Sequence, residues 1–284
     1  MKMFLMLIII ATGFNFHLLG STLDIGLVAR YTFENNALDQ SGNGRNGVTS
    51  NINYGPDRFT NSSGSALYMN NQNGRTYVDV KNIFTDQSIQ QNFTFSIWLK
   101  PTDYSSHSEQ AYNIFMGYIT DNPANRRPVL RLHNDNSMSY SSYLGVVART
   151  PSSKIIHNDW NQVVFRGDNS TKEMVIDIFN VNGQSTTLFN FGLSDTLWPT
   201  SSEINPNIII GADISAQLND QWNIDYHQNL IFTGAMDDIR IYNRTLSNVE
   251  VLSLNAAESV PEPSALSLLA VGLGVLFRRS RKRD

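Results

Sequence analysis

Short apolar alternations recur along the middle of the chain, and clusters rich in Asn, Gly, Ser and Asp separate them. In the clearest run, from Phe93 to Leu99, every second residue is large and apolar, and Pro101 follows. Because side chains alternate between the two faces of a strand, this run predicts a strand with one apolar face that ends at the proline. Similar runs predict strands at 26–33, 75–80, 129–133, 162–166, 174–180, 207–211 and 236–242.

Helical periodicity is convincing at only one place, the segment 246–252. Ser247 can cap a short helix there, with Glu250 three residues on, as in a capping box. Many short strands without an internal low-complexity linker or repeat predict one all-β domain over residues 23–257, a β-sandwich of the jelly-roll kind.

Residues 1–22 have the layout of a secretory signal peptide. Lys2 precedes a short apolar run from Met3 to Ala11, and small residues follow near Gly20 to Thr22. The apolar run is shorter than the roughly 20 residues that a membrane-spanning helix needs. We therefore expect these residues to be an export signal that is removed, rather than part of the fold.

Residues 258–284 form a second targeting segment, which has three parts. Pro261-Glu262-Pro263 leads into an apolar segment, 265–277, and Arg278 and Arg279 open a basic end. A helix of this segment is short for the bilayer, and the positive-inside tendency places the preceding domain outside. We expect 265–277 to form a short transmembrane helix that anchors the chain in the membrane before processing. An ordinary single-pass anchor is the alternative interpretation.

This three-part tail closely resembles the PEP-CTERM sorting signal of Gram-negative bacteria. The resemblance implies an exported protein that is transiently anchored in the inner membrane and processed by a membrane protease of the exosortase type. It also implies an association with exopolysaccharide, at the cell surface or in the extracellular matrix.

The composition of the chain limits the kinds of site and binding partner that can be expected. The chain has no cysteine, so a disulfide framework, a thiolate metal site and a cysteine nucleophile are excluded. Its formal net charge is −4, and the body is more acidic than the whole because five of the last seven residues are basic. Phosphate neutralisation needs clustered Lys and Arg, so nucleic acid is not expected as a partner.

Five segments of the body, in order along the chain, resemble laminin-G-like, concanavalin A-like jelly rolls: 27–34, 38–47, 93–101, 160–165 and 232–247. The region 103–150 matches less well, and we expect loop elaboration there. In that family, a calcium ion often sits where the early loop meets the late Gly-x-x-Asp-Asp turn. Carried over, this nominates Asp39, Asn43 and Asp237 as ligands, with Glu34 as a helper, for a structural calcium. The alternative is that Asp39 and Asn43 form side-chain-bonded turns without metal.

Catalytic motifs are absent from the sequence. The Glu-x-Asp-x-x-Glu pattern of the related glucanases does not occur, and Glu173 and Asp177, four residues apart, would lie roughly 13 Å apart along a strand. Nor is there a Gly-x-Ser-x-Gly turn, a His-Glu-x-x-His motif or a phosphate-binding glycine loop.

Aromatic platforms beside Asn and Asp suit sugars, so binding is more plausible than catalysis. The candidate platforms are the tyrosines of the less family-like region, each of which could instead be an ordinary core residue: Tyr104, Tyr112, Tyr118, Tyr140 and Tyr143. We expect an exported, non-enzymatic surface or matrix protein that binds extracellular polysaccharide or a surface protein. The alternatives are a divergent glycan-active enzyme and a purely structural matrix component.

Overall fold

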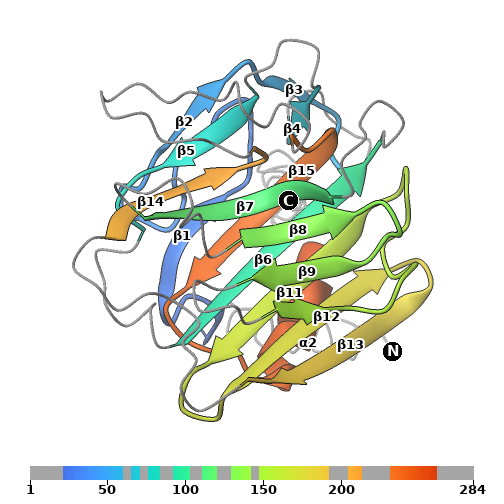
Figure 1. Cartoon of the computed structure of the whole chain (residues 1–284). Coiled ribbons are helices and arrows are strands. Elements are labelled where there is room, and N and C mark those ends of the chain that lie inside the picture. Colours follow the sequence, from blue (N-terminus) through green and yellow to red (C-terminus); the bar gives the residue numbers. More distant parts are fainter. Residues whose placement is uncertain are drawn as a thin grey trace, which may run out of the picture.

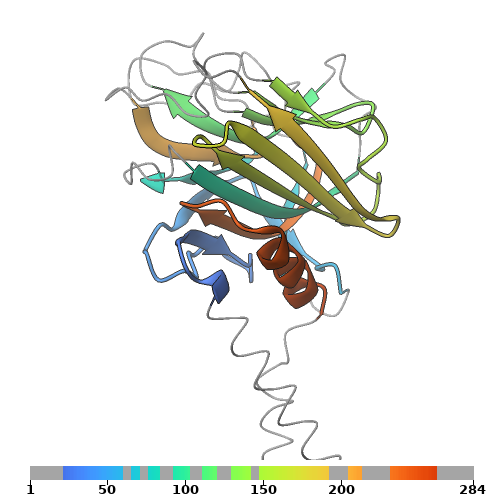
Figure 2. The same cartoon turned by 90° about the horizontal axis from the view of Figure 1, so that it is seen from below.

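Two antiparallel β-sheets stack face to face, and one helix lies outside them (Figures 1 and 2). The computed structural model describes residues 22–59, 65–70, 76–83, 92–102, 111–119, 129–141, 147–191, 204–212 and 231–260. Fifteen strands and the helix α2 fall within these ranges. The predicted all-β sandwich is confirmed, whereas most of the predicted signal peptide and the tail beyond Val260 lie outside the described residues.

Sheet A has eight strands in the spatial order β13-β12-β11-β6-β15-β4-β3, with β1 paired to β15 beside β4. Its strands have these bounds: β1 Leu27–Tyr31, β3 Asn53–Gly55, β4 Ala66–Met69, β6 Asn92–Pro101, β11 Asn161–Asp168, β12 Glu173–Asn180, β13 Gly183–Asn190 and β15 Gly234–Tyr242. The strand β15, close to the end of the domain, therefore lies in the middle of the sheet, where it joins early and late parts of the chain.

Sheet B has seven strands in the order β10-β9-β8-β7-β14-β5-β2. Its strands have these bounds: β2 Gly47–Ser50, β5 Tyr77–Val80, β7 Ala111–Ile119, β8 Val129–His133, β9 Met138–Ser141, β10 Val147–Arg149 and β14 Ile204–Ile210. Four of them, β7 to β10, come from the region 103–150, where loop elaboration was expected. Of these four, the sequence predicted β8 through the run 129–133, and it hides the other three because their alternation is short and mixed with Ser, Tyr and Asn.

The core fills the space between the two sheets. Phe93, Phe95, Ile97 and Leu99 of β6 all belong to it, as their alternation predicts, and β6 ends at Pro101. The ring of Phe95 lies 4.5 Å from that of Phe115 on sheet B, measured between centroids. Burial of such large apolar side chains is the main stabilising contribution in a sandwich without disulfides.

The helix α2, Asn248–Glu258, covers the outer face of sheet A (Figure 2). Ser247 caps it and forms the predicted capping box with Glu250, so that prediction is confirmed. Val251 and Leu254 pack with Tyr242 of β15 and with Leu23 from the first described residues. Both ends of the described chain therefore lie at the α2 side of the sandwich.

Candidate functional site

The register of sheet A places a row of polar side chains beneath the C-terminal half of α2. Gln162 of β11 is paired with Trp98 of β6, and Trp98 is paired with Asp237 of β15. All three alternate with core residues, so their side chains lie on the outer face of the sheet, and all three are buried. Polar groups removed from water in this way need hydrogen-bond partners.

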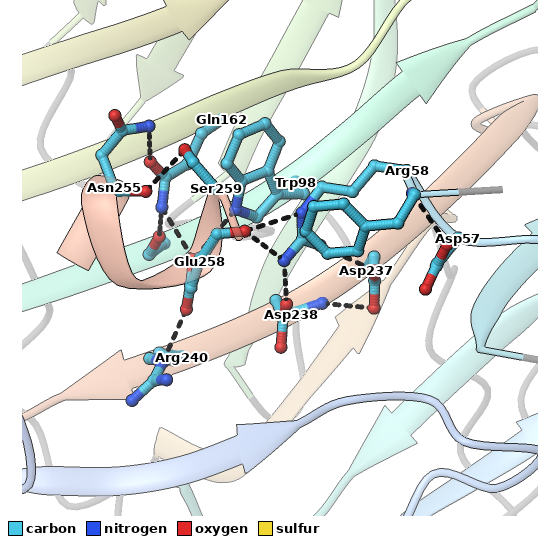
Figure 3. Close-up of polar contacts among 12 residues, drawn as sticks. Asp57, Arg58, Trp98, Gln162, Asp237, Asp238, Arg240, Asn255, Glu258 and Ser259 are labelled. Atoms are coloured by element: carbon cyan, nitrogen blue, oxygen red, sulfur yellow. Dashed lines mark hydrogen bonds and ion pairs between the residues drawn. The ribbon is translucent and has the colours of Figure 1, made fainter. Parts of the chain in front are cut away.

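Glu258, the last residue of α2, supplies those partners (Figure 3). Its Oε2 accepts hydrogen bonds from Trp98 Nε1 at 2.9 Å and Gln162 Nε2 at 2.8 Å, and its Oε1 accepts one from Arg240 Nε at 2.7 Å. Asn255, one turn earlier, donates to Gln162 Oε1. Both carboxylate oxygens are thus used to fix the end of the helix to three strands.

Arg58, from the segment between β3 and β4, closes the network from the other side (Figure 3). Its guanidinium lies 4.6 Å from the centroid of the Trp98 ring and donates to the main-chain oxygen of Glu258. A cation at the C-terminal carbonyls also complements the helix dipole. The same guanidinium forms ion pairs with Asp237, at 2.7 Å, and with Asp238.

A β-bulge explains how two successive aspartates reach one arginine. The register of β15 against β6 shifts between Asp237 and Arg240, and Asp238 has a positive φ of 41°. An extra residue at a bulge turns the strand locally, so side chains that would alternate lie on the same side. Burial raises the pKa of Asp237, with the neighbouring Asp238 charge adding to the rise and Arg58 opposing it.

The contacts of this network hold the end of α2 against sheet A. Burial and the nearby Asp238 charge raise the pKa of Glu258, and Arg240 and Arg58 oppose the rise. Perturbed carboxyl groups of this kind also occur in active sites, where they face a substrate cleft. Here each carboxylate has a side-chain or backbone partner within the protein. We name this group the C-terminal clamp: Arg58, Trp98, Gln162, Asp237, Asp238, Arg240 and Glu258.

A second buried arginine fixes the other end of α2. Arg166 of β11 forms an ion pair with Asp177 of β12 at 2.7 Å. Its remaining guanidinium nitrogen donates to the Leu246 carbonyl and to Asn248 Oδ1 at the start of the helix. Asp177, one of the two acids weighed as a catalytic pair, is therefore the buried partner of an arginine.

A hollow of about 360 Å³ lies beside Arg166, between the β11–β13 strands and the start of α2. Val175 and Leu188 form its apolar floor. Its polar lining comes from six further side chains: Asp168, Thr171, Glu173, Thr186, Thr245 and Asn248. Hydroxyl, amide and carboxylate groups around an apolar floor form a surface suited to a small polar ligand.

Two carboxylates of this hollow, Asp168 and Glu173, are opposite residues of the β11–β12 hairpin. Partial burial raises the pKa of Asp168, but hydrogen bonds from the Ser170 side chain and the Ser170 and Thr171 backbone outweigh it and lower that pKa. A glycoside-cleaving pair needs one carboxyl group with a raised pKa as the acid. The shift at Asp168 has the opposite direction.

The four predicted calcium ligands have other partners here. Asp39 accepts main-chain hydrogen bonds from Arg30, Ser41 and Arg45, and these bonds lower its pKa against the effect of partial burial. The Asn43 amide donates to the Leu27 and Val28 carbonyls, Asp237 belongs to the C-terminal clamp, and Glu34 is exposed.

Within the described ranges, no three His, Cys, Asp or Glu side chains converge as a metal site would require. The contacts of Asp39 and Asn43 match the metal-free turn that was the alternative interpretation. The residues do not fit one shared calcium site in this arrangement, and calcium stays a prediction.

The predicted sorting residues Pro261, Glu262, Pro263, Arg278 and Arg279 lie outside the described residues. So do the apolar segment 265–277 and two of the candidate tyrosine platforms, Tyr104 and Tyr143. No helix of the described part is long and apolar enough to cross a membrane.

The remaining tyrosine platforms lie in sheet B. Tyr140 is not a platform, because it is buried in the core against Phe93. Tyr112 and Tyr118 lie on β7.

The sequence did not point to the C-terminal clamp. Arg58 is a single arginine in a loop, and its partners are up to 200 residues away in the chain. One signal was available at Glu258. It follows Val251 and Leu254 at helical spacing, so it falls on the buried side of α2, where an acid needs partners.

Comparison with known proteins gives two family matches. Residues 71–252 match the model of the concanavalin A-like lectin/glucanases superfamily. Residues 259–282 match the PEP-CTERM protein-sorting motif, which begins directly after α2. A search of curated proteins gives no match.

Solved structures with the same fold include binding domains of botulinum neurotoxins. The binding domain of botulinum neurotoxin DC in complex with SialylT is 14% identical, with a TM-score of 0.57 over 83% of this chain and 52% of that chain. The serotype D ligand binding domain in complex with N-acetylneuraminic acid is also 14% identical, with a TM-score of 0.56 over 84% and 52%. The chain spans about half the length of these domains.

The family model covers more than half of the chain, and the two stacked sheets have the corresponding architecture. The predicted PEP-CTERM tail is confirmed as well. The protein is therefore a member of the concanavalin A-like lectin/glucanases superfamily that carries a PEP-CTERM sorting tail.

Proposed function

We propose that this protein is an exported, non-enzymatic surface or matrix protein that binds glycan through its laminin-G-like domain. The observation that carries the proposal is the junction of the two matched parts. The domain ends at Glu258, which is fixed to three strands, and the sorting motif begins at residue 259. A sorting tail attached without a spacer to a clamped domain suits a protein whose task is to be displayed.

Two features support binding over catalysis. The acids of the C-terminal clamp and of the Arg166 pair are occupied by partners within the protein. The toxin structures with the same fold are binding domains, two of them in complex with SialylT or N-acetylneuraminic acid.

We place the glycan in the hollow between β11, β12, β13 and α2. Thr186 and Asn248 can bond sugar hydroxyls, while the apolar floor contacts C–H groups. The carboxylates of Asp168 and Glu173 make the rim acidic, so neutral or amino sugars suit it better than acidic ones.

A glycan array probed with the full chain in detergent tests binding. Leu188, on the floor of the hollow, is 54% exposed, so Leu188→Arg should fill the hollow without disturbing the core, and binding should fall at least several-fold. Val181→Arg, at an exposed position of the same hairpin outside the hollow, is the matched control. If both variants bind glycan equally well, the hollow is not the glycan site. If the wild type binds no glycan, the structural matrix role is the remaining hypothesis.

The export part is tested separately in a Gram-negative host that has an exosortase-type protease. The wild-type chain should lose its tail and reach the cell surface or the medium. The triple change of Pro261, Glu262 and Pro263 to alanine should leave the full-length chain in the inner-membrane fraction. Equal processing of both chains would exclude Pro-Glu-Pro as the sorting determinant.

A further inference from the structure

Four exposed apolar residues lie on the solvent side of α2 and just beyond its end. Val249, Leu252 and Val260 are 71%, 49% and 48% exposed, and Ala256 is exposed between them. The spacing of three and four residues places Val249, Leu252 and Ala256 in one stripe along the helix, and Val260 follows just beyond the helix end. We define the α2 stripe as Val249, Leu252, Ala256 and Val260.

This stripe reverses the usual pattern, in which a surface helix turns its charged side to water. Only two residues of α2 are charged, and both are used elsewhere. Glu250 belongs to the capping box and pairs with Arg244, and Glu258 is buried in the C-terminal clamp. The stripe therefore contains no charged side chain.

Ile25 is a further exposed apolar residue near the start of α2. It is 62% exposed, and its carbonyl accepts a hydrogen bond from Arg244, which also pairs with Glu250 at the start of α2. Exposed apolar side chains that gather on one side of a soluble domain mark a surface that contacts another molecule or a membrane.

The tail shows what lies close to this surface. Six residues, 259–264, separate Glu258 from the apolar segment 265–277. Even fully extended, the chain from Glu258 to Ala265 spans at most about 25 Å. Because the C-terminal clamp fixes Glu258, the segment that enters the bilayer starts within that distance of the α2 stripe.

We propose that the α2 stripe and Ile25 rest on the lipid surface while the tail is in the membrane. This proposal depends on the membrane insertion of the tail that the proposed function includes. A second copy of the chain fits the stripe less well, because a stable protein interface uses about 20–30 residues on each side. Docking would hold the α2 side of the sandwich toward the bilayer and leave the face of sheet B toward the exterior.

The absence of cysteine allows a direct test with the full chain. Single cysteines at Leu252→Cys and at Val48→Cys are labelled with an environment-sensitive fluorophore. Val48 is the matched control, because it is 56% exposed but lies on sheet B, in the layer away from α2. Each labelled chain is reconstituted into phosphatidylcholine vesicles with or without a lipid-borne quencher, and flotation confirms that the chain is attached.

At Leu252 we expect blue-shifted emission and quenching several-fold stronger than at Val48. Added salt should not change the quenching at Leu252, since the stripe has no charged side chain. In a chain labelled at Ile25→Cys, the additional change Val249→Glu should abolish the quenching.

Three results would overturn docking on lipid. Attached chains with equal quenching at both positions would refute the docked stripe but leave the membrane tail intact. Chains that do not float would refute docking and the membrane tail together. A blue shift without lipid quenching that grows with protein concentration would show that a second copy covers the stripe.

Discussion

Glu258→Ala should be among the most damaging single substitutions on the outer face of sheet A. It removes the acceptor for the Arg240 guanidinium, the Trp98 indole N–H and the Gln162 amide, all of which remain buried. Breaking a buried ion pair by deleting one partner costs about 3–5 kcal/mol. For a domain of this size, that loss lowers the midpoint of thermal unfolding by about 6–20 °C.

The assay is thermal unfolding of the full chain in detergent, followed by circular dichroism. Asp24→Ala is the control, because it removes an exposed carboxylate near the start of the domain. Glu258→Gln retains the side-chain volume and one acceptor oxygen, so its midpoint should lie between those of the wild type and of Glu258→Ala. If Glu258→Ala unfolds at the same temperature as the control, the clamp does not stabilise the end of the domain.

Three further predictions concern the early loop and the start of α2. Asp39→Ala should lower the unfolding midpoint even in a chelator, because three main-chain N–H groups lose their acceptor. Millimolar calcium in the same assay tests the calcium prediction: it requires a rise in the wild-type midpoint that Asp39→Ala abolishes. The hydrogen bond from Arg244 lowers the pKa of Glu250 to about 2 from an ordinary 4.5. The stabilisation that the Arg244–Glu250 pair adds to the free energy of unfolding should thus be complete above about pH 4.5 and lost as the pH falls toward 2. Urea unfolding of wild type and Glu250→Gln across that range should converge at low pH, and parallel curves would contradict the assignment.

The sequence by itself determined the local elements whose signals are short in range. Alternation along Phe93–Leu99 defined β6 and its buried face, because the side-chain period of a strand is fixed by its backbone. Ser247 and Glu250 defined the start of α2, because a capping box needs only residues three apart. The sorting tail was also readable, since its three parts are contiguous in the chain.

Strands with weak alternation were missed for a related reason. The exposed edge strand β13 has the sequence GQSTTLFN, and β9 has MSYS, so neither has a strong apolar period. Their positions are fixed by pairing with β12 and with β8 rather than by their own residues. Pairing of this kind depends on the neighbouring strand, which propensity alone does not include.

Only the tertiary structure decided the roles of the polar residues. Asp237 was nominated as a calcium ligand, but a bulge in β15 directs it and Asp238 to Arg58, nearly 180 residues earlier in the chain. Glu258 gains its partners from β6, β11 and β15 together. A side chain's partners depend on which strands the fold places side by side, and on which groups it buries there. The sequence specifies the chemistry of each group, whereas packing determines which group it meets.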